Sequence, residues 1–134
     1  MAHKISDHFS YDEMKCRGKI CKCGRADMDP EFMKLLEEIR MAYGKPMYLS
    51  SAFRCDVHNA AVSKIPNGPH TFQKNGSLAV DVLTWGPEAK ILFTVAQNVG
   101  ATGFGVQQTG EIKDRFLHID YVQRQKGSSG FWNY

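Results

Sequence analysis

The sequence NGPHTFQKNGSLAVDV, at residues 67–82, decides how this chain is expected to fold, because it changes within a few residues from loop to strand. Proline and glycine recur up to Gly76, which predicts a loop over residues 65–77. The apolar run that follows predicts a strand over residues 78–83. We therefore expect this strand to form part of a small sheet.

Toward the N-terminus, capping residues predict two helices. Ser10 and Glu13 form a capping box that begins a short helix. Asp29 caps a longer helix, whose first residue is Pro30 and which Gly44 ends. The other predicted elements are a strand at 47–50, helices at 56–63 and 87–98, and strands at 104–107 and 116–121. Helices early in the chain and strands later predict an α+β fold, with helices packed on a small antiparallel sheet.

The length and composition of the chain fit a single domain over residues 1–134, with 43% of residues hydrophobic. No apolar run is long enough to cross a bilayer, and the first residues, MAHKISDHFSYDEM, lack the apolar segment of a secretory signal. We therefore expect synthesis in the cytoplasm of a bacterium or phage host, without membrane insertion. The net charge of +3 indicates a solvated surface or, less strongly, a polyanionic partner. His3 and His8 are expected to be exposed.

Three polar residues predict a metal site. His70 lies on the loop, Asp81 inside the apolar strand, and His118 on a later strand within DRFLHIDY, residues 114–121. Two neutral imidazoles and one carboxylate from separate segments are typical of a catalytic zinc ion, which keeps one position open for water. An unpaired buried carboxylate at Asp81 would be costly, and this favours ligation. The pattern predicts a zinc hydrolase.

Four cysteines allow several interpretations. Cys16, Cys21 and Cys23 share a predicted loop over residues 15–27, and Cys55 lies far along the chain. The spacing C-x4-C-x-C matches no common zinc-finger pattern, and a reducing cytoplasm disfavours disulfides. Reduced thiols are the favoured interpretation. A metal held by these thiols, and one disulfide between the loop and Cys55, are the alternatives.

Four stretches of the chain, in this order, resemble the zinc D-Ala-D-Ala carboxypeptidase family. They are LEEIRMAYGKPMYLSSAFRCDVHNAAV at 36–62, NGPH with GSLAVDV at 67–82, GFGV at 103–106 and RFLHIDY at 115–121. This family also includes L-alanyl-D-glutamate endopeptidases of bacteriophage lysis, and the ending F-x-H-x-D is most similar to its compact phage-type branch. The resemblance runs from Phe9 to Tyr121 and implies a hedgehog-like zinc peptidase fold.

The resemblance also implies roles for single residues. The three residues named above as zinc ligands match the ligands of the family, so the implied cofactor is Zn²⁺. Arg54 matches an arginine that faces the substrate carboxylate or carbonyl, and its permanently charged fork suits an oxyanion. Asn59 is expected to have a structural role. Trp132 is expected to pack in the core or at an edge, with substrate contact as the alternative.

Two departures from the family pattern concern the loop and the general base. Ten residues separate His70 from Asp81 where the family usually has six, which is expected to reshape the cleft wall while both loop ends stay in place. The family usually has a carboxylate three residues before the last histidine, where this chain has Arg115, which cannot accept a proton. Asp114 is favoured as the base. Asp120 is next, and could instead orient an imidazole or contact the metal.

The resemblance implies hydrolysis of an amide bond in the peptidoglycan stem peptide or cross-link, by an L-alanyl-D-glutamate endopeptidase or a D,D-type peptidase. A short, basic chain favours a phage endolysin that reaches the cell wall late in infection. We expect a monomer whose partner is the peptidoglycan peptide and not nucleic acid. The alternatives are a catalytically silent zinc-bearing wall-binding module, as the signalling relative hedgehog suggests, and a phage structural protein.

Overall fold

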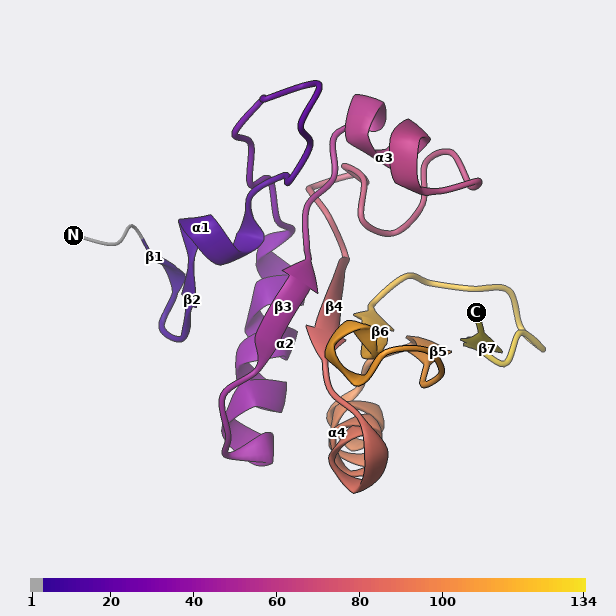
Figure 1. The fold of residues 1–134 in the computed structure, drawn as a ribbon. Coiled ribbons are helices and arrows are strands. Elements are labelled where there is room, and N and C mark those ends of the chain that lie inside the picture. The colour runs from indigo at the N-terminus through magenta and orange to yellow at the C-terminus, as the bar shows by residue number, and fades with distance from the viewer. Residues whose placement is uncertain (1–3) are drawn as a thin grey trace.

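The computed structural model describes residues 4–134 as an α+β fold, in which helices pack on a five-stranded sheet (Figure 1). The helices are α1 (Tyr11–Met14), α2 (Pro30–Tyr43), α3 (Asp56–Val62) and α4 (Gly86–Val99), with a 3-10 turn, η1 (Ile112–Asp114). The strands are β1 (Lys4–Ser6), β2 (Phe9–Ser10), β3 (Tyr48–Ser51), β4 (Ala79–Leu83), β5 (Gly103–Gln107), β6 (Phe116–Asp120) and β7 (Phe131–Asn133). His8 is exposed as expected, and the expectation for His3 falls outside the described residues.

The strand order of the main sheet is β3-β4-β6-β5-β7. The first four strands pair antiparallel, as predicted, but β7 pairs parallel to β5, so the sheet is mixed and not wholly antiparallel. The loop after β6 brings the chain back beside β5 in the same direction. With only three residues, β7 is too short to show a reliable strand pattern in the sequence. The β1–β2 pair was not predicted either.

The predicted caps form as expected. The Asp29 side chain accepts hydrogen bonds from the main-chain amides of Glu31 and Phe32 at the start of α2. At its other end, Gly44 takes the left-handed conformation, with φ of 74°. The capping box of Ser10 and Glu13 is also present, and it begins α1.

The core lies between the helices and one face of the sheet. Its fully buried members include, from α2, α4, β4 and β6, Phe32, Leu36, Ile39, Leu92, Ala96, Val80, Val82, Leu117 and Ile119. Side chains alternate between the two faces of a strand, so Asp81 and His118 emerge from the opposite face. The apolar face fixes the strand register, and the register in turn places the polar site.

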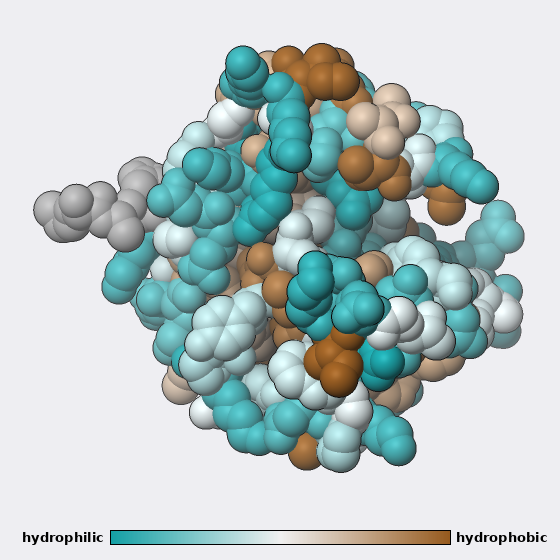
Figure 2. All heavy atoms as spheres, viewed as in Figure 1, coloured by the Kyte–Doolittle hydropathy of each residue, from teal (hydrophilic) through white to brown (hydrophobic). Residues whose placement is uncertain are grey.

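The surface in Figure 2 is largely hydrophilic, with hydrophobic side chains gathered at its top, where Figure 1 places α3 and the loop before α2. Exposed apolar side chains of these segments include Ile20, Val57 and Val62. Among the described residues, no helix has both the length and the apolar character to cross a membrane.

Candidate metal centre and cleft

One row of residues crosses the open face of the sheet from edge to edge. In the strand register, Ser51 pairs with Asp81, Asp81 with His118, His118 with Gly105, and Gly105 with Trp132. Directly opposed residues of neighbouring strands have their Cβ atoms about 5 Å apart, so side chains of this row meet. The sheet thus supplies an imidazole and a carboxylate side by side.

His70 reaches this pair from the loop before β4. Its Nδ1 lies 2.7 Å from the carbonyl oxygen of Ala52. A carbonyl oxygen only accepts, so Nδ1 carries the proton and Nε2 has a free lone pair. This Nε2 lies 3.3 Å from Oδ1 of Asp81 and 3.2 Å from Nδ1 of His118.

His118 is held by a buried ion pair behind it. Its Nε2 donates to Oδ2 of Asp120 at 2.8 Å. Both oxygens of Asp120 also accept hydrogen bonds from Arg124, each at 2.8 Å, so Asp120 is a carboxylate and an acceptor only. The proton of His118 therefore resides on Nε2, and the lone pair of Nδ1 faces Oδ1 of Asp81 at 3.0 Å.

The three facing atoms fit a zinc ion. They are separated by 3.0 to 3.3 Å, and their residues are all buried. Ligands about 2.0–2.1 Å from a tetrahedral zinc lie about 3.3 Å from one another. Two imidazole lone pairs and a carboxylate oxygen that point at one place would repel each other without a cation. This cluster of His70, Asp81 and His118 can therefore hold a metal ion.

The electrostatics of these groups favour a cation. Burial opposes charge on Asp81, but the neighbouring His70 and His118 outweigh it and lower the pKa of the carboxyl group. Burial also lowers the pKa of the His70 imidazole. For His118, hydrogen bonds to Asp120 and Asp81 overcome burial and raise the pKa. A proton on Nδ1 of His118 occupies the place a metal would take, so protons and metal compete for this site.

Beside the three residues lies a cleft of about 300 Å³, and Arg54 stands on its wall. The guanidinium of Arg54 donates from Nε to Oγ of Ser51 at 3.1 Å and from Nη2 to Oδ2 of Asp81 at 3.3 Å. Its main-chain amide donates to the carbonyl of His70 at 2.9 Å. The structure thus brings Arg54 to the metal centre and to the wall of the cleft.

The two candidate bases lie in different places. Asp114 is exposed on η1, with Oδ1 3.6 Å from Nζ of Lys113, and it does not line the cleft. Asp120 lies behind His118, fully buried, where it orients the imidazole. Within the described part of the chain, Asp81 is the single acidic side chain among the residues lining the cleft.

Two aromatic side chains near the C-terminus complete the cleft. The ring of Trp132 lies 5.2 Å from that of His118, and Tyr134 packs on Phe116 at 5.2 Å between ring centroids. Both Trp132 and Tyr134 line the cleft, and substrate contact by Trp132 stays a prediction. Tyr134, which directly follows β7, was missed, and both Trp132 and Tyr134 lie against Gly105 of β5.

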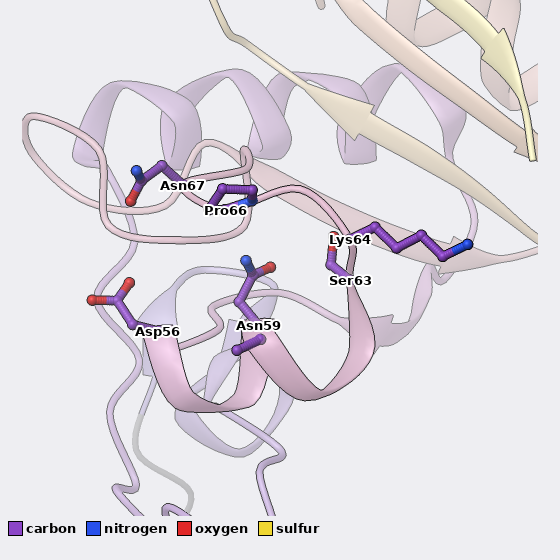
Figure 3. Close-up of a pocket in the computed structure, with 7 residues that line it drawn as sticks. Asp56, Asn59, Ser63, Lys64, Pro66 and Asn67 are labelled. Carbon is purple, nitrogen blue, oxygen red and sulfur yellow. The ribbon is translucent and has the colours of Figure 1, made fainter.

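The loop that carries His70 is fixed at both ends despite its extra residues. The amide of Leu78 donates to the carbonyl of Pro69 at 3.0 Å, which closes the loop beside the ligand. Nδ2 of Asn59 donates to the carbonyl of Ile65 at 3.0 Å. Figure 3 shows Asn59 rising from α3 toward the loop at Pro66, across a neighbouring pocket. This contact agrees with the structural role expected of Asn59.

Comparison with known proteins identifies the family. The family model for Peptidase M15 matches residues 7–120, which contain all three facing residues of the metal centre. Neither a search of curated proteins nor a search of solved structures returned a match. The match confirms the M15 zinc peptidase family, whereas the specific subfamily and the phage-type branch stay predictions.

Proposed function

This chain belongs to the peptidase M15 family, and from that premise we propose that it hydrolyses an amide bond in the stem peptide or cross-link of bacterial peptidoglycan. M15 peptidases are zinc-dependent, and the chain has a histidine–aspartate–histidine group that can bind the metal. The observation that carries the proposal is the convergence of these three donor atoms beside a cleft whose wall presents Arg54.

We propose distinct tasks for the residues of this site. His70, Asp81 and His118 hold zinc, which when bound supplies Lewis acidity and a water that ionises near neutral pH. Asp120 keeps the proton of His118 on Nε2, so that Nδ1 remains a ligand. Arg54 binds the carbonyl or carboxylate oxygen of the peptide and stabilises the negative charge that develops there.

Asp114 is our proposed acceptor for the proton of the attacking water. It precedes His118 by four residues and is the carboxylate nearest to β6 on its N-terminal side. Because its side chain is exposed and outside the cleft lining, its function requires the segment at 108–115 to approach the bound peptide. Loop movement of this kind commonly completes a catalytic site when substrate binds.

The setting we propose is the cell wall, reached as a phage endolysin acting as a monomer. A net charge of +3 supports attraction to an anionic wall polymer. Arg54 on one side of the cleft and the rings of Trp132 and Tyr134 on another suit a short peptide with a carboxylate and small apolar side chains. Nucleic acid and membrane lipid are not part of this proposal.

The decisive experiment is mass spectrometry of purified peptidoglycan after incubation with the protein. New amine termini at one stem-peptide bond are expected. They should disappear with a zinc chelator and in His118→Ala, but persist in His8→Ala, which removes an exposed histidine far from the cleft. The bond at which they form distinguishes the L-alanyl-D-glutamate from the D,D-type activity. Intact muropeptides from several wall types would refute hydrolysis.

One observation favours a second candidate, a zinc-bearing wall-binding module without catalysis. The cleft lining in the described part of the chain offers no acidic side chain free to accept a proton, since Asp81 faces the metal centre. Such a module would sediment with purified wall and contain zinc, yet release no new termini. The same digestion therefore separates the two candidates.

A further inference from the structure

All four cysteines of the chain meet at one point, away from the cleft described above. Their sulfur atoms lie within 4.8 Å of one another. Sγ of Cys16 is 3.8 Å from Sγ of Cys21 and 3.8 Å from Sγ of Cys55. Three of the cysteines come from the loop between α1 and α2, and Cys55 precedes α3. The sequence alone favoured reduced thiols, with a shared metal or a disulfide to Cys55 as the alternatives, and the structure shows that the four cysteines do converge.

The two separations of 3.8 Å match a tetrahedral metal site, and all four sulfurs lie within 4.8 Å of one another. Four thiolates about 2.3 Å from a zinc ion are separated from one another by about 3.8 Å. A disulfide would require sulfurs about 2.0 Å apart, and all four cysteines are free. Four sulfurs gathered around one centre is the donor set of a structural zinc site, in which protein ligands fill every position.

Apart from its sulfurs, the loop is held by a few polar contacts, such as the hydrogen bonds from Tyr11 to the carbonyl of Gly24 and from Arg17 to the carbonyl of Leu49. From Arg17 to Asp27 no residue is buried, and no helix or strand forms. Ile20 at its tip is 81% exposed, and the loop's apolar packing against the core comes from the partly buried Cys21 and Ala26. Ordering an irregular segment of this length costs conformational entropy. Hydrogen bonds at the base of the loop, such as that from the amide of Cys16 to the carbonyl of Arg25, offset this cost only in part.

Burial raises the pKa of the Cys16 thiol to about 12, but other surroundings of the sulfurs suit thiolates. The amide of His58 donates to Sγ of Cys55 at 3.4 Å, and amides of Cys55 and Gly18 point at Sγ of Cys16. A side chain at Gly18 would overlap Sγ of Cys21, so the main chain must pass close to that sulfur. The loop at 15–27 also contains five basic residues, Lys15, Arg17, Lys19, Lys22 and Arg25, and one acidic residue, Asp27, which pairs with Arg25. Positive charge of this kind offsets the net negative charge of a zinc ion with four thiolates.

Backbone strain marks the same place. Lys22, between Cys21 and Cys23, has a φ of 47°, in the left-handed region that side chains other than glycine rarely adopt. Strain of this kind costs about 1 kcal/mol and persists where the surroundings enforce it. A shared metal on the two flanking sulfurs would enforce it.

We propose that Cys16, Cys21, Cys23 and Cys55 bind a structural zinc ion that fastens the loop between α1 and α2 to the segment before α3. Arg54 precedes Cys55 directly, so the same ion holds the arginine of the cleft in position. This site is separate from the His70–Asp81–His118 centre and does not depend on the proposed peptidase activity.

The test is the zinc content of the full chain, purified with a non-chelating reductant and measured by plasma mass spectrometry. Wild type should contain two zinc ions per chain. His118→Ala should retain one, and X-ray absorption of that variant should show sulfur ligands at about 2.3 Å. Cys23→Ser, at the exposed cysteine, should lose the sulfur-bound ion, whereas Ile20→Ser in the same loop should keep it.

Three results would overturn the proposal. The first is that the His118→Ala variant folds but contains no zinc. Another is absorption data with nitrogen or oxygen ligands alone. The third is a disulfide among the four cysteines in protein denatured and alkylated without reduction. If the cysteine variants fail to fold, cobalt titration of wild type remains decisive, because tetrahedral thiolate ligation gives a sulfur-to-cobalt charge-transfer band and nitrogen ligation does not.

Discussion

Asp120 holds His118 from behind, with Oδ2 2.8 Å from Nε2 of the imidazole. The carboxylate is itself fixed by two hydrogen bonds from Arg124 and has no exposed surface. Burial opposes its ionisation, but the hydrogen bonds from Arg124 and His118 lower its pKa to about 2. At neutral pH, Asp120 therefore remains an acceptor that keeps the ring of His118 in one tautomer and one orientation.

Replacing Asp120 with asparagine should weaken zinc binding at the His70–Asp81–His118 centre by about 10- to 100-fold. The amide would turn a donor toward either His118 or Arg124, both of which are donors themselves. The affinity is measured by competition with a chromophoric chelator, in a Cys23→Ser background so that thiols do not contribute. Asp114→Asn makes the same chemical change at an exposed carboxylate and should leave the affinity unaltered. Equal affinities for the two variants would contradict this role of Asp120.

Gly103 makes room for that ion pair. It faces Asp120 across the β5–β6 pair, and a Cβ there would overlap Oδ1 of Asp120 and Nη1 of Arg124. Gly103→Ala should therefore destabilise the fold by about 1–3 kcal/mol, as overpacking does, and weaken zinc binding too. Urea unfolding measures the first effect. In Gly68→Ala the new Cβ meets only the carbonyl of Ile65, at 3.6 Å, so this control should stay within about 0.5 kcal/mol of wild type.

Helix-capping residues and the alternation of apolar and polar side chains along strands made most of the fold predictable from sequence. Asp29, Pro30 and Gly44 set the limits of α2 through interactions between near neighbours, which a sequence displays directly. The parallel pairing of β7 with β5 depends on where a long loop returns, and no local pattern encodes that. The class was therefore predictable, and the mixed character of the sheet was not.

The candidate site was also predictable from sequence only in part. His70, Asp81 and His118 have chemistry that stands out in their surroundings, and all three were anticipated and do converge. The cysteine cluster was weighed only as an alternative to separate reduced thiols, because a spacing in sequence does not reveal that Cys55 folds back onto the loop before α2. The partnership of Asp120 with Arg124 also escaped notice, since it depends on the turn after β6.

Tyr43 should make stability depend on alkaline pH. Burial, together with a 2.6 Å hydrogen bond to Glu88, raises the pKa of its phenol to about 12, against about 10 in an unfolded chain. The protonated phenol is thus favoured by folding, so its contribution is present below about pH 10 and is lost as the pH rises toward 12. Tyr43→Phe should cost about 1 kcal/mol near pH 8. The difference between the two proteins in urea unfolding should shrink above about pH 10, and a constant difference would refute the assignment.

Arg54 should matter for substrate rather than for the metal. Arg54→Ala is expected to lower kcat/KM by about 10²–10³, the usual effect of removing one donor to a developing oxyanion. Arg54→Lys should recover only part of the loss, because an ammonium lacks the planar fork that reaches both Ser51 and a substrate oxygen. Zinc content measured on the same samples should remain at the wild-type value. Loss of zinc in either variant would show that its contact with Asp81 is structural instead.

Asp114 gives the sharpest test of the mechanism. Its side chain lies outside the cleft, whereas its carboxylate has the chemistry that a general base requires. Removing a general base costs about 10²–10⁴ in rate, so Asp114→Asn should lower kcat by at least about 100-fold with zinc content unchanged. Glu111→Gln, which removes another exposed carboxylate of the same segment, should have little effect. Full activity in Asp114→Asn would exclude it as the base. Since no other acidic side chain than Asp81 lines the cleft in the described structure, that result would direct the search to a second carboxylate brought in with the substrate.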